Sequence, residues 1–112
     1  LGNGMQNKPY LHVDDCVSGM LHGVSHAHAN YNVFNLSPQS RTLVYEIVDE
    51  IIRQLNLKEI KVVYGTSDRG WHGDVPSFAL DSKKIRELGW QQNKTSHQAV
   101  TQAVKEVIRQ CK

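Results

Sequence analysis

Apolar residues recur at intervals of three and four positions in three stretches of the chain, a spacing that places side chains on one face of a helix. The stretches cover about residues 13–26, 42–55 and 95–108. The second has the clearest apolar stripe, which is formed by Val44, Ile47, Val48, Ile51, Ile52 and Leu55. The pattern therefore predicts three amphipathic helices, each with one face available for packing.

Short polar side chains and glycines mark where these helices begin and end. Thr95 and Gln98 form a capping-box pattern at the start of the last helix. A fourth, shorter helix is expected to end at Gly89, because glycine adopts the backbone conformation that follows many helices. The remaining expected caps are Asp14 or Asp15 for the first helix, Thr42 for the second and Asp81 for the short one.

Four short stretches favour strands, namely residues 10–13, 31–36, 60–64 and 78–80. A long polar loop over residues 65–77 separates the last two. The sequence therefore predicts an α/β fold in which short strands pack with about four helices. These strands are too few and too short for a doubly wound sheet, and a Gly-x-Gly-x-x-Gly turn is absent.

The charge balance excludes some partners. Lys and Arg number 13 against 11 Asp and Glu, which gives a formal net charge of +2. No basic block is long enough to indicate a nucleic-acid surface. No apolar run approaches the roughly 18 residues that a membrane-spanning helix needs. We therefore expect neither a nucleic-acid nor a membrane partner.

The two cysteines bear on the cellular compartment. Cys16 and Cys111 lie far apart, and neither belongs to a Cys-x-x-Cys motif or to a set of residues with metal-ligand spacing. We interpret both as reduced, mostly buried thiols of a cytoplasmic protein. His22 and His26 are four residues apart but have no acidic partner between them, so we expect no metal site there.

The loop over residues 67–76 is the most unusual stretch, because it combines Arg69, Trp71 and His72 with two acids and two glycines. Glycine lets a backbone approach a ligand closely, and an arginine presents a fork of donors that suits phosphate oxygens. The alternative is a surface loop in which Asp68 and Asp74 pair with Arg69 while Trp71 closes the core. Composition alone slightly favours this second interpretation.

Four motifs occur in order along the chain. They are Gly-Asn-Gly-Met-Gln leading to Tyr-Leu-His-Val-Asp-Asp over residues 2–15, Val-Phe-Asn-Leu over residues 33–36, Asp-Arg-Gly-Trp-x-Gly-Asp-Val-Pro over residues 68–76, and Leu-Asp-Ser-Lys-Lys followed by Leu-Gly-Trp over residues 80–90. Together they resemble the extended short-chain dehydrogenase/reductases, and among them the NAD-dependent epimerase/dehydratase family of UDP-glucose 4-epimerase-like proteins. The resemblance covers nearly the whole chain.

The resemblance implies four residues that bind substrate. Lys8 takes the place of a basic residue, often arginine, that contacts the pyrophosphate of a nucleotide sugar. Arg69 takes the place of the second pyrophosphate-binding arginine, and Asp74 that of an acid near the ribose. Trp71 is a further candidate for substrate contact, with core packing as its alternative. The ligand implied is a nucleotide sugar, most simply a UDP-sugar.

The family's catalytic pair, Tyr-x-x-x-Lys, is absent, because the residues four positions after the four tyrosines are Asp14, Asn35, Asp49 and Asp68. We therefore expect no catalytic, cofactor-binding or metal-binding residue in this chain. In the parent enzyme, NAD would oxidise a sugar hydroxyl and the keto-sugar would be re-reduced or dehydrated. The chain begins with Leu1 rather than Met, and this predicts one domain, residues 1–112, from the C-terminal, substrate-binding side of a longer epimerase.

Several alternatives stay open at this point. The parent enzyme is predicted to be a nucleotide-sugar epimerase, with a dehydratase or a reductase as alternatives, and a stand-alone binding or interaction module that kept the fold is the other class of function. A missing N-terminal Rossmann domain is the expected partner. Because the surface that faces it would be exposed, we also expect a homodimer or a domain-swapped oligomer. The chain by itself is predicted to be inactive.

Overall fold

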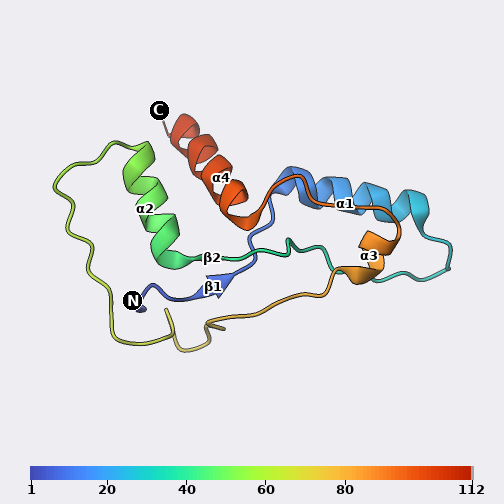
Figure 1. Ribbon diagram of the computed structural model, residues 1–112, viewed down its shortest axis with the longest axis horizontal. Coiled ribbons are helices and arrows are strands. Elements are labelled where there is room, and N and C mark those ends of the chain that lie inside the picture. The colour runs from blue at the N-terminus through green and yellow to red at the C-terminus, as the bar shows by residue number, and fades with distance from the viewer. Residues whose placement is uncertain (112) are drawn as a thin grey trace.

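The computed structural model describes residues 1–111, which form an elongated molecule of 55 × 33 × 19 Å (Figure 1). Four helices and a two-stranded sheet lie within these residues, which confirms the predicted α/β class. In chain order the elements are β1 (Asn7–Lys8), α1 (Val13–His26), β2 (Thr42–Leu43), α2 (Val44–Gln54), α3 (Lys83–Glu87) and α4 (Ser96–Gln110).

The small sheet joins segments that are distant in sequence. Strand β1 pairs with β2 in antiparallel fashion, with Asn7 opposite Leu43 and Lys8 opposite Thr42. Asn7 also forms an isolated parallel bridge with Ser77, and its N–H donates to the carbonyl of Pro76 at 2.7 Å. As a result, the N-terminal segment lies between the start of α2 and the end of the long loop.

The first two helices begin where the sequence predicted but with different caps. The ring Nδ1 of His12 accepts the N–H of Asp14 at 3.3 Å, so His12 caps α1, and the prediction of Asp14 or Asp15 is wrong. Thr42 is buried in β2, where its hydroxyl bonds that of Ser96 at 2.8 Å, and it is therefore unavailable as a cap.

The starts of α2, α3 and α4 all have local polar partners. In α2 the N–H of Leu43 donates to the Glu46 carboxylate at 2.7 Å. The Asp81 carboxylate accepts the N–H of Lys83 at 2.8 Å at the start of α3, although Ser82 occupies the cap position. The capping box of Thr95 and Gln98 is confirmed at α4. Gly89, with a φ of 96°, follows α3 as expected.

The predicted strands are wrong as hydrogen-bonded elements. Within residues 1–111 none of the stretches 10–13, 31–36, 60–64 and 78–80 is a strand, and Val13 already belongs to α1. Periodicity marks a chain that is suited to a sheet, but a strand exists only when a neighbour supplies the hydrogen bonds. The only ladder in the described residues instead uses two-residue segments that have no such pattern.

The buried apolar core is small, and its most buried members are Ile85, Trp90, Ala99 and Val100. Ile85 and Trp90 lie beside the glycines of α1, whereas Ala99 and Val100 belong to α4, which packs against α2. Trp90 is 4% exposed and donates to the Ser18 hydroxyl at 3.3 Å, so it is a packing residue. The cysteines are both free, but Cys111 is exposed and Cys16 only half-buried, so the expectation of buried thiols is wrong.

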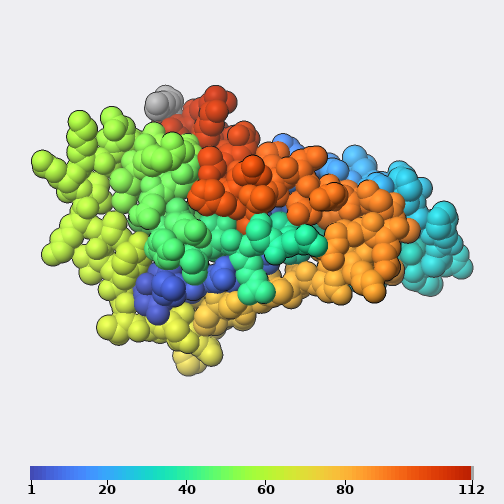
Figure 2. All heavy atoms as spheres, viewed as in Figure 1, coloured from blue at the N-terminus to red at the C-terminus, as the bar shows by residue number. Residues whose placement is uncertain are grey.

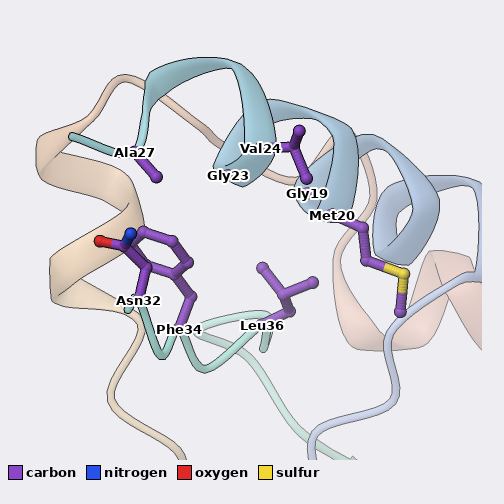
Figure 3. Close-up of a pocket in the computed structure, with 8 residues that line it drawn as sticks. All are labelled: Gly19, Met20, Gly23, Val24, Ala27, Asn32, Phe34 and Leu36. Carbon is purple, nitrogen blue, oxygen red and sulfur yellow. The ribbon is translucent and has the colours of Figure 1, made fainter. Parts of the chain in front are cut away.

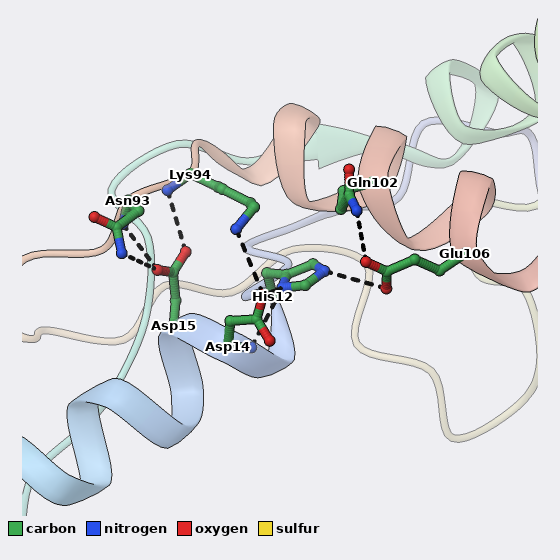
Figure 4. A network of polar contacts seen from close by, with 7 residues as sticks. All are labelled: His12, Asp14, Asp15, Asn93, Lys94, Gln102 and Glu106. Atoms are coloured by element: carbon green, nitrogen blue, oxygen red, sulfur yellow. Dashed lines mark hydrogen bonds and ion pairs between the residues drawn. The ribbon is translucent and has the colours of Figure 1, made fainter.

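A polar cluster joins the start of α1 to the start of α4 (Figure 4). The carboxylate of Asp15, which is 1% exposed, accepts the N–H groups of Asn93 and Lys94 at 2.9 and 3.1 Å and the Asn93 amide at 3.0 Å. Close by, Nε2 of the buried His12 lies 3.5 Å from the Glu106 carboxylate. Asp15 thereby fixes the turn that leads into α4.

Candidate functional site

A cavity of about 290 Å³ opens where the N-terminal segment, the start of α2 and the long loop meet. In the space-filling view the N-terminal residues (blue) lie between the α2 region (green) and the loop after residue 65 (yellow) (Figure 2). One side of the cavity is apolar and its rim is polar. Its lining residues are Leu1, Gly2, Gly4, Gln6, Lys8, Val44, Val48, Val62, Val63, Tyr64, Gly70 and Asp74.

Lys8 and Asp74, which are 66 positions apart in the sequence, meet at this rim. The Lys8 ammonium lies 2.6 Å from one carboxylate oxygen of Asp74, and the other oxygen accepts the N–H of Gly70 at 3.0 Å. Asp74 is 6% exposed, whereas the Lys8 side chain is 29% exposed. The Lys8 bond and the Gly70 N–H lower the pKa of Asp74 below its usual 3.8, so the carboxylate stays ionised.

This geometry leaves the Lys8 ammonium partly available. An ammonium has three N–H donors, and Asp74 accepts one of them. The buried carboxylate holds the nitrogen at the rim of the cavity, and the other two donors can bind an anion there. Both oxygens of Asp74 are engaged within the chain, so the role near a ribose that the resemblance implies for Asp74 stays a prediction.

Hydrogen bonds join the three segments that line the cavity, which are the N-terminal segment, the start of α2 and the long loop. Gln6 accepts from Val44 through its carbonyl at 3.0 Å, and its side-chain amide donates to the carbonyl of Asp68 at 3.1 Å. The N–H of Gly65 donates to the carbonyl of Gly2 at 2.9 Å. Gly4 has a φ of 79°, and a Cβ built there would lie 2.7 Å from the Tyr64 ring. A glycine is therefore required at position 4.

Arg69 lies on the exposed part of the loop. Its N–H donates to the Ser67 hydroxyl at 3.1 Å. Across residues 1–111 its guanidinium makes neither a hydrogen bond nor an ion pair. The alternative in which Arg69 fixes the loop through Asp68 or Asp74 is therefore not the arrangement observed, because Asp74 pairs with Lys8 instead.

Trp71 does not close the core. Its side chain is 66% exposed, and its ring lies against Gly73, where a built Cβ would approach a ring carbon to 2.4 Å. The indole is not among the residues that line the cavity. The packing interpretation of Trp71 is wrong, and its contact with a ligand stays a prediction.

The candidate residues are therefore only partly brought together. Lys8 and Asp74 are in contact, while Arg69 and Trp71 lie on the exposed loop that ends at Asp74. Sequence reasoning missed the apolar wall and Tyr64 as members of the site. Gln6 could have been found from the sequence, since it belongs to the Gly-x-Gly-x-Gln segment. Its hydrogen bond to the loop has no signature in the sequence.

Other kinds of site are not found in the part of the chain that the structure describes. No group of His, Cys, Asp and Glu among residues 1–111 is arranged to hold a metal. His22 instead bonds the carbonyl of Leu88 at 2.8 Å and stacks on His26, with ring centres 3.9 Å apart. No described helix is long and apolar enough to cross a membrane.

The chain matches no family model and no curated protein by sequence. Its structure is similar to a UDP-galactose 4-epimerase, with a TM-score of 0.78 and 24% identity over 95% of this chain and 34% of that one. It is also similar to a dTDP-glucose 4,6-dehydratase from Bacillus anthracis in complex with NAD, with a TM-score of 0.76 and 22% identity over 96% and 33% of the two chains.

A third similar structure is the UDP-glucose 4-epimerase of Thermotoga maritima with UDP-glucose. The TM-score is 0.75 at 23% identity, and the match covers all of this chain and 35% of that one. The chain thus spans about a third of the length of the structures that it matches. Residues 1–111 therefore have the fold of the matched third of these nucleotide-sugar epimerase and dehydratase structures.

Proposed function

We propose that this chain is the part of an NAD-dependent nucleotide-sugar epimerase that binds the diphosphate of a UDP-sugar. The observation that carries the proposal is the Lys8 ammonium, which a buried carboxylate holds at the rim of a cavity. The fold supports it, because the similar structures are nucleotide-sugar enzymes and one of them contains UDP-glucose.

Each of the four candidate residues would have a different role in binding, according to its side-chain chemistry. Lys8 supplies a fixed positive charge with two unshared donors, and Asp74 positions it. Arg69 supplies a forked donor set on a loop that is anchored at both ends but exposed in the middle, so it can close over a diphosphate. Trp71, next to it, offers an exposed ring that can cover part of the ligand.

The chemistry of the parent enzyme would come from outside these residues. We propose that residues 1–112 form one substrate-binding domain on the C-terminal side of a longer cytoplasmic enzyme, and that a Rossmann domain supplies NAD and the catalytic Tyr-x-x-x-Lys pair. When bound, NAD would accept and return a hydride. This chain's residues would grip the nucleotide and so position the sugar.

A dehydratase is the second candidate, favoured by one observation. The dTDP-glucose 4,6-dehydratase matches as well in fold as the epimerases do. Both reactions begin with oxidation at the sugar and share the grip on the nucleotide. The residues that distinguish them would lie in the rest of the enzyme.

The test is a titration of the isotopically labelled chain with UDP, followed by amide chemical shifts. We expect shifts to cluster in residues 2–8 and 65–74. Lys8→Met should weaken binding by roughly tenfold or more, since a charge-assisted bond contributes about 1.5–3 kcal/mol. The matched control is Lys58→Met, at an exposed lysine after α2, which should bind like the wild type. Equal binding by both variants would contradict the proposal.

A further inference from the structure

Two cavities of the described residues differ in the ligand chemistry that they offer. The one between α1 and residues 32–36 is lined mostly by apolar groups, such as Leu36, which lies 2.7 Å from a Cβ built on Gly19 (Figure 3). None of the described residues that line it is charged, so it offers no partner for an anion. The cavity at Lys8 differs because charged and hydrogen-bonding groups of the long loop surround it.

The N-terminal segment is hydrogen-bonded to this loop through its backbone near both ends of the loop. The N–H of Asn3 donates to the carbonyl of Ser67 at 2.7 Å, and the N–H of Asn7 donates to the carbonyl of Pro76 at 2.7 Å. These bonds fix where the loop leaves and rejoins the N-terminal segment. The turn over residues 68–74 lies between them, and side chains of the segment hold it.

Two side chains of the N-terminal segment hold the two ends of this turn. Nε2 of Gln6 donates to the carbonyl of Asp68 at 3.1 Å, and Lys8 bonds the Asp74 carboxylate at 2.6 Å. Residues two positions apart in an extended chain point to the same side and lie about 6.6 Å apart. Gln6 and Lys8 therefore hold the turn from one side, at its first and last residues.

The Gln6 bond acts on the peptide group that leads directly into Arg69. That peptide group is planar, and it contains both the carbonyl of Asp68 and the N–H of Arg69. The carbonyl accepts from Gln6, and the N–H donates to the hydroxyl of Ser67 at 3.1 Å. The Ser67 bond stays within the exposed loop, whereas the Gln6 bond connects the peptide group to another segment. Gln6 thereby fixes where Arg69 begins relative to Lys8.

Gln6 is itself held firmly. It is 3% exposed, and its carbonyl accepts the N–H of Val44 at 3.0 Å, which ties it to the start of α2. Its amide also needs the space that Gly2 leaves. A Cβ built on Gly2 would overlap the Gln6 amide nitrogen and would lie 3.1 Å from the carbonyl oxygen of Arg69. The amide thus passes between Gly2 and the backbone of the loop.

We propose that Gln6 is a positioning residue for Arg69. By holding the carbonyl of Asp68, it keeps Arg69 beside the cavity that the next residue, Gly70, lines. The Arg69 guanidinium and the Lys8 ammonium can then bind one diphosphate together. The diphosphate rests on the proposed function, whereas the effect of Gln6 on the loop can be measured without any ligand.

The first test measures the order of the loop in the chain without ligand. Gln6→Met keeps an unbranched side chain of similar length but has no donor. Nitrogen-15 relaxation should give order parameters near about 0.85 for the amides of Arg69 and Gly70 in the wild type, falling to about 0.6 or less in Gln6→Met. The control Gln91→Met, in the exposed segment between α3 and α4, should keep the wild-type values. Unchanged loop order in a folded Gln6→Met would overturn the proposal.

The second test asks whether Gln6 acts through Arg69. Gln6→Met should weaken UDP binding by roughly three- to tenfold, as expected for the loss of one neutral hydrogen bond, and Gln91→Met should leave it unchanged. In an Arg69→Ala background the same change should weaken binding by less than about twofold, because its target is gone. An undiminished effect in that background would overturn the proposal, since Gln6 would then act on the ligand or on the fold as a whole.

A second variant decides the case in which Gln6→Met does not fold. Gly2→Ala keeps Gln6 but pushes its amide away from Asp68, so the order of Arg69 and Gly70 should fall while the melting temperature changes little. Retained loop order in Gly2→Ala would then overturn the proposal. A wild-type chain that does not bind UDP would contradict the proposed function and the shared diphosphate, whereas the relaxation data would still decide whether Gln6 positions Arg69.

Discussion

Lys8 and Arg69 carry the same charge but present different hydrogen-bond geometries to an anion. Lys8 is a compact ammonium already held by Asp74, whereas the Arg69 guanidinium has no internal partner within residues 1–111. A forked guanidinium can bond two phosphate oxygens at once, and an ammonium cannot reproduce that geometry. Under the proposed function, Arg69 is therefore the residue whose expected contribution to binding is least mixed with a contribution to folding.

The substitution Arg69→Lys separates these two roles. We expect it to weaken UDP binding by roughly ten- to a hundredfold, because the forked contact is lost. The melting temperature should stay unchanged, since the side chain is exposed. Titration with UDP and thermal unfolding would measure the two effects. A lower melting temperature with unaltered affinity would show that Arg69 has a structural role instead.

Asp74 gives a prediction about pH. Its pKa is lowered below 3.8 by Lys8 and the Gly70 N–H, so its contribution to stability is complete above that pH and is lost as the pH falls through the lower, folded-state pKa. Asp74→Asn should therefore lower the melting temperature by several degrees at neutral pH, and the difference should shrink in acid. Thermal unfolding across this pH range measures it.

Asp68→Asn is the matched control for that measurement, because Asp68 is exposed in the same loop and bonds Gln6 through its carbonyl only. It should behave like the wild type at every pH. An Asp74→Asn deficit that stayed constant down to strongly acidic pH would mean that the ionised pair is not its cause.

At the scale of elements, the turn before α4 depends on one buried carboxylate. Asp15 accepts three N–H donors from Asn93 and Lys94. Asp15→Asn replaces one acceptor oxygen by a donor that faces another donor, so we expect a loss of about 3 kcal/mol in the free energy of unfolding. Its exposed neighbour provides the control, since Asp14→Asn should cost less than about 1 kcal/mol. Urea unfolding of both variants would measure the difference, and equal losses would contradict the assignment.

The helices were predictable from the sequence because their signals are local. The apolar stripe after Thr42, the capping box at Thr95 and the terminating Gly89 each act within a few residues. The cap of α1 was not predictable, because a histidine side chain took the place of an aspartate. Residues 31–36 have the alternating pattern of a strand but no hydrogen-bonded neighbour within residues 1–111. The pattern alone does not show whether such a neighbour is present.

The candidate site shows the same division between local and distant information. The resemblance placed Lys8 and Asp74 in a site, but only the folded chain brings them to 2.6 Å. The contact arises because β1 pairs with β2 and bridges to Ser77, and none of these segments has a local signal. The bond from Gln6 to the loop and the apolar wall of the cavity were unpredictable for this reason.

At the scale of the whole molecule, the candidate site occupies one end. The cavity lies where β1, the start of α2 and the long loop meet, and α1 lies at the opposite end (Figure 1). Because no residue of α1 lines the cavity, the effects of substitutions at the two ends should be additive.

We also predict that the chain by itself does not bind NAD. Binding of a dinucleotide pyrophosphate needs a glycine-rich turn between a strand and the start of a helix. Here the segment with Gly2 and Gly4 leads into β1, and Gly4 packs against Tyr64, so it opens no helix. Calorimetric titration with NAD should give no saturable signal, while UDP under the same conditions serves as the positive control. A one-to-one NAD isotherm would show that these residues hold a cofactor site of another kind.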